Sequence, residues 1–322
     1  MIVLFTTQRH SYTHQSLVKS QELNFKTQSY EKLFRDFTLP RATYIFGDLD
    51  RLDFWDLECA ARLYNDLRDK GMRVFNNPAK FRSRYQLLRK LYRDGHNGFN
   101  VWQADDVVPD EAYPVFLRTD CAHRGVMSEL IHTPKELASG IKSLIERSVP
   151  IREIVVIQYA AEPVAPGLFR KHGSLKVGDR IIPRPCVHED HWVAKYGVEG
   201  IASDALYEED YQLIKENAYS ETIEAVFAAS ELDYGRADFG IFRGQPQIYE
   251  INTNPTIPSP CLEHPSPVRL ETSRLARAQL LEAFQEIDGP MTGKSIQLAH
   301  PPSLRQRIQR PSLHWRRVPK MP

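Results

Sequence analysis

Two acidic residues, one amide and one arginine lie at alternating positions in the second half of the chain, where they could bind a metal ion. Two short apolar runs flank residues 244–246, a turn-prone break, and this pattern predicts a β-hairpin. Alternation along a strand places Arg236 and Asp238 on one face of the first arm. It likewise places Glu250 and Asn252 on one face of the second arm, with Asp238 roughly opposite Glu250. Two carboxylates this close repel unless a cation lies between them, so with the amide of Asn252 they predict an all-oxygen site that suits Mg²⁺.

An ordinary edge hairpin is the simpler alternative, because most acidic side chains face solvent. The neighbouring residues favour a polar site on a buried hairpin instead, since most of them are apolar. These neighbours are Phe239, Ile241, Phe242, Ile248, Tyr249 and Ile251.

The segment from Arg236 to Asp238, followed by residues 250–255 (Glu-Ile-Asn-Thr-Asn-Pro), resembles the metal-binding hairpin of ATP-grasp enzymes of the D-alanine–D-alanine ligase and glutathione synthetase type. The resemblance implies that the two carboxylates and the amide hold magnesium, and that Arg236 is catalytic and steadies the reacting acyl phosphate. It is specific over these twenty-odd residues and looser over about residues 75–285. The fold it implies is the ATP-grasp fold, of the α/β class with α+β ATP-binding lobes.

The N-terminal part predicts a small parallel α/β lobe, because strand and helix patterns alternate there. A helix is expected from about Phe54 to Lys70, with Asp53 as its N-cap. The expected strands are residues 2–6, 44–47 and 73–75. The loop after the first strand carries Arg9, His10 and His14 at the carboxyl edge of the sheet, where such sheets bind ligands. A solvated surface loop is the alternative.

A second helix is expected from Asn77-Pro78 to Gly95, and the resemblance implies that it contributes to nucleotide binding. Counted back from Gly95, the position of the family's first phosphate-binding lysine is Arg84. Arg118, on an expected strand at residues 113–118, takes the place of the second. Arginine keeps the charge of lysine but changes its geometry.

The loop at residues 119–125 corresponds to the family's glycine-rich flap over the phosphates, yet it holds a single glycine. His123 and Arg124 could supply side-chain donors in place of backbone ones. The strand that follows, at residues 153–160, corresponds to the hinge beside adenine. By that resemblance Gln158, Tyr159 and Ala160 line the adenine pocket, although a plain core strand also explains the apolar residues.

The segment after the hinge predicts a meander with a two-residue turn at Gly178-Asp179. Lys171, Lys176 and Arg184 are candidates to point into the cleft, and Lys195 resembles a lysine that some family members direct at the phosphates. His188 and His191 are expected in a loop, where a zinc site is an alternative without the usual spacing. Long helices are expected at residues 208–232 and 267–287.

The expected domains are an N-terminal α/β lobe, a central ATP-grasp lobe with its linking helix, a C-terminal ATP-grasp lobe and a basic tail. Their bounds are residues 1–77, 78–164, 165–290 and 291–322. The tail has seven Lys or Arg and no acid, so we expect it to be extended or disordered, or docked on the acidic body.

The overall composition is ordinary for a globular protein: 322 residues, a net charge of +1 and 42% hydrophobic residues. No apolar run approaches the length of a membrane span, and the four cysteines lie far apart, which fits a reducing cytoplasm. Nucleic acid is not expected as a partner, and a homodimer is left open.

The resemblance implies an ATP- and magnesium-dependent ligase that joins a carboxylate substrate to an amine, or less often a thiol, through an acyl phosphate. One alternative is a phosphotransferase on the same fold, in which a hydroxyl accepts the phosphoryl group. Another is a nucleotide-binding module without catalysis, which the arginines at both lysine positions and the glycine-poor flap keep open. The acid and the amine are not named by the sequence.

Overall fold

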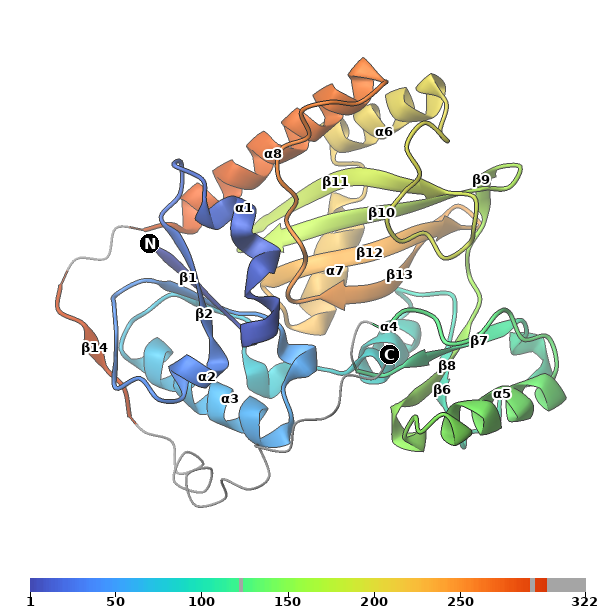
Figure 1. Cartoon of the computed structure of the whole chain (residues 1–322), viewed down its shortest axis with the longest axis horizontal. Helices are drawn as coiled ribbons and strands as arrows, with labels where there is room; N and C mark the ends of the chain where they lie inside the picture. The colour runs from blue at the N-terminus through green and yellow to red at the C-terminus, as the bar shows by residue number, and fades with distance from the viewer. Residues whose placement is uncertain (122–123, 290–292, 300–322) are drawn as a thin grey trace.

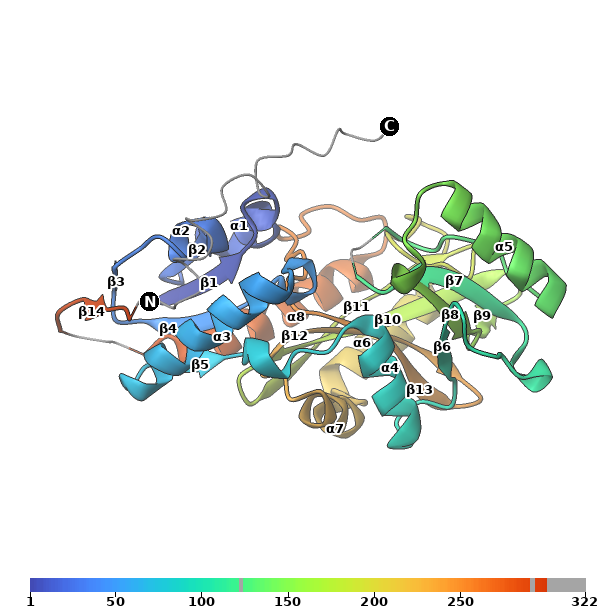
Figure 2. The same cartoon turned by 90° about the horizontal axis from the view of Figure 1, so that it is seen from below.

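The computed structural model describes residues 1–121, 124–289 and 293–299. Its strands form three separate larger sheets, and helices pack against each of them (Figures 1 and 2). The hairpin that carries the candidate site belongs to the largest sheet. The other two sheets contribute residues that lie next to this site.

The chain begins with a parallel four-stranded sheet, as its alternating pattern predicts. The strand order is β2 (Phe25–Ser29), β1 (Ile2–Thr6), β4 (Thr43–Phe46) and β5 (Val74–Phe75). β2 is not predicted by apolar periodicity, because four of its five residues are polar and form no apolar run. Helix α3 (Phe54–Asp69) begins after Asp53, whose carboxylate accepts a hydrogen bond from the amide of Asp56, as expected of an N-cap.

Short elements complete this N-terminal lobe. They are η1 (Gln8–His14), α1 (Gln15–Val18), α2 (Tyr30–Leu33), β3 (Thr38–Leu39), η2 (Leu49–Arg51) and β14 (Ile296–Gln297). β14 pairs with β3, and Ile296 and Leu298 are buried in the core of the lobe. Part of the expected basic tail therefore docks on the body of the protein, while residues 291–292 and 300–322 lie outside the described residues.

A three-stranded antiparallel sheet holds the expected hinge strand at its centre. Its order is β6 (Val101–Gln103), β8 (Ile154–Gln158) and β7 (Val115–Thr119), and the short turns η4 (Asp110–Ala112) and η5 (Ile151–Glu153) precede its last two strands in the chain. Helix α5 (Pro134–Glu146) begins after Thr133, whose hydroxyl accepts a hydrogen bond from the amide of Glu136.

The expected helix from Asn77 to Gly95 is wrong at its start. Asn77 caps only a short 3-10 turn, η3 (Pro78–Lys80), and helix α4 (Arg84–Arg93) begins after Ser83. Ser83 and Gln86 form a capping box, in which each side chain bonds the backbone of the other. Two helix-start signals lie close together here, and the more complete one begins the long helix.

The largest sheet is antiparallel and contains both expected hairpins. Its order is β11 (Arg180–Glu189), β10 (Leu168–Val177), β12 (Tyr234–Phe242) and β13 (Gln245–Asn252), with β9 (Pro163–Ala165) paired to β10. Asp238 lies opposite Glu250 in the register of β12 and β13, as predicted.

Each face of the large sheet has its own cover. Helix α8 (Pro267–Ile287) and the N-terminal lobe pack on the face that carries Leu175 and Ile182, which we call the α8 face. Helices α7 (Ser220–Ser230) and α4 pack on the face that carries Phe239, which we call the α7 face (Figure 2). The bounds of α8 agree with the expected helix at residues 267–287, and among the described residues no helix combines the length and the hydrophobicity needed to cross a membrane.

The expected single helix at residues 208–232 is wrong. The structure has two helices there, α6 (Asp204–Glu216) and α7, separated at Asn217. Asn217 has φ 50° and ψ 49°, the left-handed conformation that asparagine tolerates better than most residues. Its amide also donates a hydrogen bond of 2.9 Å to the carbonyl of Ile181, so tertiary contact fixes the break.

Candidate functional site

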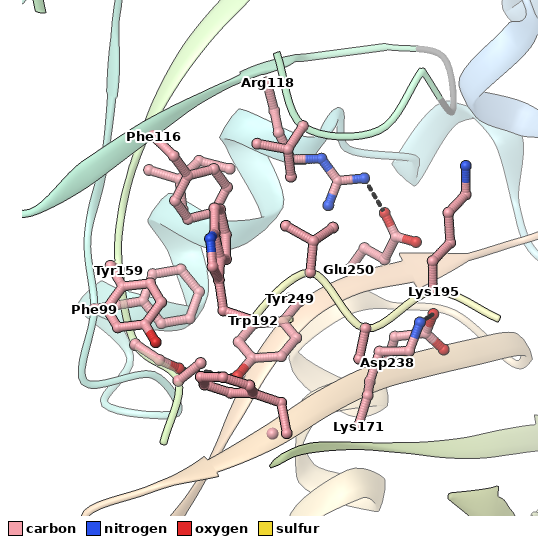
Figure 3. A pocket seen from close by; sticks show the side chains of 18 of the residues that line it. Phe99, Phe116, Arg118, Tyr159, Lys171, Trp192, Lys195, Asp238, Tyr249 and Glu250 are labelled. Carbon is pink, nitrogen blue, oxygen red and sulfur yellow. Dashed lines mark hydrogen bonds and ion pairs between the residues drawn. The ribbon is translucent and has the colours of Figure 1, made fainter. Parts of the chain in front are cut away.

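A pocket lies between the three-stranded sheet and the α8 face of the large sheet, at the place where the hinge and the hairpin meet. Figure 3 shows that its two ends differ. Aromatic side chains, among them Phe116 and Tyr159, gather at one end, and charged ones, among them Arg118, Lys171 and Glu250, gather at the other.

The aromatic end is closed by Trp192, which lies in the loop that follows β11. The ring of Trp192 lies 5.0 Å from the ring of Phe116 and 5.6 Å from that of Tyr159. Phe99 and Tyr249 complete this end. Such a set of rings buries a flat apolar group and can stack on it.

Tyr249 connects the hairpin to the hinge. Its hydroxyl donates a hydrogen bond of 2.9 Å to the carbonyl of Ala160, and burial raises the pKa of the phenol. The register of β12 and β13 shifts beside Asp238, because β13 has one residue more, Tyr249, between the partners of Asp238 and Phe239. Gly240 makes the close approach possible, since a Cβ there would lie 2.2 Å from the Tyr249 hydroxyl oxygen.

All three expected hinge residues line the pocket. Gln158 and Tyr159 already form hydrogen bonds with residues next to the strands of the three-stranded sheet. The Gln158 side-chain oxygen accepts a hydrogen bond of 3.1 Å from the amide of Asn100, and the amide of Tyr159 donates to the carbonyl of Pro114 at 3.0 Å. The side chain and the backbone amide of Gln158 therefore hold the hinge in place, and ligand contact by Gln158, Tyr159 and Ala160 stays a prediction.

At the charged end, Asp238 is nearly buried and is bound by two cations. The Arg236 guanidinium donates to both carboxylate oxygens, at 2.5 and 3.0 Å, and the Lys171 ammonium lies 3.6 Å away. Burial lowers the pKa of Arg236 and the Asp238 charge raises it, with a net increase. Of the three candidates for the cleft, Lys171 is the one that lines this pocket; Lys176 instead pairs with Glu224 on the α7 face.

Glu250 is held by two arginines that come from other parts of the chain. Arg84 of α4 and Arg118 of β7 each donate to the same carboxylate oxygen, at 3.0 and 3.1 Å. The Nε atoms of both arginines are buried without a hydrogen-bond partner. Burial lowers the pKa of Arg118, and the charge of Glu250 opposes that shift.

We call these six side chains the hairpin cluster: Arg84, Arg118, Lys171, Arg236, Asp238 and Glu250. Four cations surround two carboxylates, which leaves a net charge of +2. Orphaned guanidinium donors and excess positive charge both favour an anion with several oxygen atoms.

The oxygen ligands expected for magnesium suit an ion that is bound together with such an anion, and not a bare metal ion. Asp238, Glu250 and Asn252 offer hard oxygen donors on one face of the hairpin, and the Asn252 side-chain oxygen also accepts a hydrogen bond of 2.8 Å from the amide of Asn254. Among the described residues, no group of three His, Cys, Asp or Glu side chains is placed to hold a metal. A divalent cation would also meet a net positive charge here, so the donor set suits Mg²⁺ only when phosphate oxygens accompany it.

The remaining expected nucleotide contacts lie around the same pocket. Lys195 lines it and is exposed, with its ammonium 4.9 Å from the centre of the Tyr196 ring. Arg84 reaches the pocket only through Glu250, and Arg124 is exposed beside Gly125, which does line the pocket. His123 lies outside the described residues.

The loop that carries Trp192 and Lys195 is held by a single carboxylate. Glu189 accepts hydrogen bonds from the amides of Lys195, Tyr196 and Gly197, at 2.8, 2.6 and 2.7 Å. Burial raises the pKa of Glu189, but these three bonds lower it and prevail. The sequence analysis did not identify this anchor.

His188 does not lie in a loop as expected, because it is buried on β11. The histidines of the loop after the first strand are also engaged. His14 is buried and hydrogen-bonded to the Tyr234 hydroxyl, and His10 lies 2.7 Å from the Thr7 hydroxyl. This loop joins the N-terminal lobe to the end of the hairpin, since Thr13 donates to Asn254 at 2.8 Å.

Several solved structures resemble this chain. D-alanine–D-alanine ligase from Bacillus anthracis matches with a TM-score of 0.52 and 14% identity, over 96% of this chain and 98% of that one. The same enzyme complexed with ATP matches with a TM-score of 0.50, 14% identity and the same coverage. D-alanine–D-alanine ligase from Coxiella burnetii matches with a TM-score of 0.52 and 10% identity, over 89% and 94%. No protein-family model and no curated protein matches the sequence.

Proposed function

Because this chain has the ATP-grasp fold of these ligases, we propose that it is an ATP- and magnesium-dependent ligase that joins a carboxylate to an amine. One observation carries the proposal: a single pocket has aromatic rings at one end and the hairpin cluster at the other. A nucleotide has the same division, with a flat base at one end and phosphates at the other.

In this proposal adenine lies between Trp192, Phe116 and Tyr249, beside the hinge. The phosphates extend toward Arg118, Lys171 and Lys195, where charge-assisted hydrogen bonds are strong. The net positive charge of the hairpin cluster would then be compensated by the nucleotide.

Asp238, Glu250 and the side-chain oxygen of Asn252 would hold Mg²⁺ together with the phosphates. When bound, the ion neutralises the charge of the terminal phosphates during phosphoryl transfer. Arg84 and Arg118 neutralise Glu250 in the structure. With a metal ion on Glu250, both guanidinium groups become available to the phosphate oxygens.

The reaction has two steps, and the residues of this chain contribute mainly to the second. A substrate carboxylate oxygen attacks the γ-phosphorus of ATP, so that ADP leaves and an acyl phosphate forms. The amine nitrogen then attacks the acyl carbon, phosphate leaves, and the nitrogen loses a proton to give the amide. Arg236 lies beside Asp238 and would stabilise the oxyanion of this second step.

A nucleotide-binding module without catalysis is the second candidate, and the arginine pair favours it. Glu250 is already neutralised by Arg84 and Arg118, so the cluster is stable without a metal. Such a module would bind ATP through the same aromatic rings and release no ADP.

The products of turnover separate these functions. We expect a panel of carboxylic acids and amines, incubated with ATP and Mg²⁺, to give ADP, phosphate and a condensed product by mass spectrometry. ADP with a phosphorylated compound would instead identify a phosphotransferase. Binding of ATP without ADP release would identify the module.

The role of Arg236 gives a second test. Loss of one oxyanion donor typically costs a few hundredfold in rate, roughly 3–4 kcal/mol. Arg236→Lys should therefore lower the single-turnover rate by about that factor at saturating ATP and magnesium, while changing ATP affinity much less. Arg180→Lys is the matched control, because Arg180 is a half-exposed arginine of β11 that does not line the pocket. A normal rate for Arg236→Lys would remove the arginine from the catalytic step.

A further inference from the structure

Two more arginines lie on the α8 face, beyond the hairpin cluster, and among the described residues neither forms an ion pair. Arg184 of β11 donates one weak hydrogen bond, of 3.4 Å, to the carbonyl of Ala276. Arg277, which follows Ala276 on α8, donates a hydrogen bond of 3.4 Å to the carbonyl of Ser16, and the charge of Glu22 partly offsets its own. The second terminal nitrogen of Arg277 is buried and has no hydrogen-bond partner. Both side chains are half-buried, so water screens them incompletely.

Arg184 also adjoins the proposed catalytic arginine. Gly173 of β10 lies between them in the sheet, opposite Arg184 on one side and opposite Asp238 on the other. A Cβ at Gly173 would lie 3.6 Å from Cδ of Arg236 and 3.8 Å from Cβ of Arg184. Because Gly173 has no side chain, the surface of the sheet between Arg184 and Arg236 is open.

The charges in this region are not balanced. Asp238 compensates Arg236, Asp210 lies 3.8 Å from Arg269 and the charge of Glu22 acts on Arg277, but no carboxylate of the described residues pairs with Arg184. Burial, followed by the charges of Arg236, Arg277 and Arg269, lowers the pKa of Arg184 to about 10. Neighbouring cations that repel one another in a partly buried place are relieved by a bound anion.

We propose that Arg184 and Arg277 bind a second anionic group of the substrate, whose carboxylate is activated beside Arg236. The substrate is then an acid with two oxyanion groups, either a dicarboxylic acid or a carboxylic acid that also carries phosphate or phosphonate. This inference rests on the proposed ligase function, because that function places the reacting carboxylate next to Arg236.

Binding of matched acids tests the proposal without turnover. Thermal unfolding of the full chain is followed with ADP, Mg²⁺ and one acid at a time. The acids are the dicarboxylates from malonate to adipate, monocarboxylates of the same chain lengths, and the corresponding phosphonocarboxylates. We expect at least one doubly anionic acid to bind about tenfold tighter than its monocarboxylate, since a charge-assisted hydrogen bond contributes that much or more. The preferred series distinguishes a carboxylate from a phosphate group.

Variants then assign the binding to the two arginines. Arg184→Gln and Arg277→Gln should each weaken binding of the doubly anionic acid about tenfold to a hundredfold and leave the monocarboxylate nearly unchanged. Arg184→Lys should retain part of the affinity. Arg274→Gln, on an exposed position of the same helix, is the control and should bind as the parent does.

The melting temperature without ligand separates binding from a structural role. Removal of Arg184 leaves no carboxylate without its partner and relieves repulsion between neighbouring arginines. Arg184→Gln should therefore melt at the same temperature as the parent or higher. Equal binding of singly and doubly anionic acids, unchanged binding by both variants, or a lowered melting temperature for Arg184→Gln would each overturn the proposal. Tight binding of a doubly anionic acid without ADP release would refute the ligase and retain the site. ADP release with equal kcat/KM for both kinds of acid would support the ligase and refute the second anion site.

Discussion

The large sheet carries two buried groups of charged side chains, and the two groups differ in charge balance. The hairpin cluster on the α8 face has four cations and two carboxylates. The other group, which we call the α6 cluster, consists of Arg170 and His188 of the sheet and Glu209 and Asp210 of α6, and Arg269 of α8 joins it. Its two arginines are matched by two carboxylates. His188 is neutral at physiological pH, because burial and then the two arginines lower its pKa to about 4.

The two groups also differ in access. The Asp210 side chain has no exposed surface, whereas the Glu250 side chain is 17% exposed and lines the pocket. Burial raises the pKa of Asp210 to about 6 although Arg170 and Arg269 oppose that shift. A balanced cluster around a fully buried carboxylate holds helices on a sheet, whereas an open cluster with excess positive charge favours binding of an anion. Buried ion pairs alone do not mark a functional site, but their imbalance does.

The strongest contrast should come from removing one carboxylate charge from each cluster. Glu250→Gln should lower ligase turnover at least about a thousandfold, because the transferred phosphoryl group loses electrostatic stabilisation. It should also abolish most of the thermal stabilisation by ATP and Mg²⁺, since that stabilisation scales with affinity. Glu224→Gln, which removes the half-exposed partner of Lys176, is the control. An ATP-dependent shift equal to that of the parent would show that Glu250 takes no part in the site.

In the α6 cluster the effect should fall on stability instead. Asp210→Ala leaves Arg170 and Arg269 without their buried partner, so the free energy of unfolding should drop by about 3 kcal/mol. Turnover per folded molecule should stay unchanged. Glu209→Ala, the exposed neighbour on α6, should cost at most about 1 kcal/mol. If both variants lose the same small amount, the α6 cluster does not hold the fold as inferred. Denaturant unfolding measures both values.

The smallest expected effect is on the pH dependence of the free energy of unfolding. Burial, followed by Arg170 and His188, lowers the pKa of His172 on the α7 face to about 3. Below pH 6.5 the folded state then binds fewer protons than the unfolded state does. The contribution of neutral His172 to the free energy of unfolding is therefore fully present above that pH and is lost as the pH falls. His172→Phe keeps the ring that stacks on Phe239 and removes the titration. Between pH 7 and 4.5 it should lose about 2 kcal/mol less stability than the parent.

A His172→Phe variant that loses stability with acid as steeply as the parent would mean that His172 is protonated in the folded state.

Local patterns determined much of the fold. Apolar alternation around a turn predicted the hairpin and the facing of Asp238 and Glu250, and the structure has that register. The capping residue Asp53 predicted the start of α3, because a cap acts within one turn of its helix. A specific motif also led to the ATP-grasp fold, which the solved structures support.

What the sequence left undetermined depends on contacts between distant segments. The break at Asn217 needs the carbonyl of Ile181. Tyr249 reaches the hinge only through the bulge in β13 and the space at Gly240, which no periodicity marks. One missed residue had a usable signal: Phe116 lies two positions before Arg118 on the same strand, and therefore on the same face.

The sequence by itself determined which residues could bind a metal and on which hairpin they lie, because spacing along a strand decides its two faces. Only the tertiary structure decided the charge around them. Arg84, Arg118 and Lys171 come from three other elements, and their meeting with Asp238 and Glu250 depends on how the sheets pack. Electrostatic balance is a sum over neighbours in space, so a pattern along the chain cannot give it.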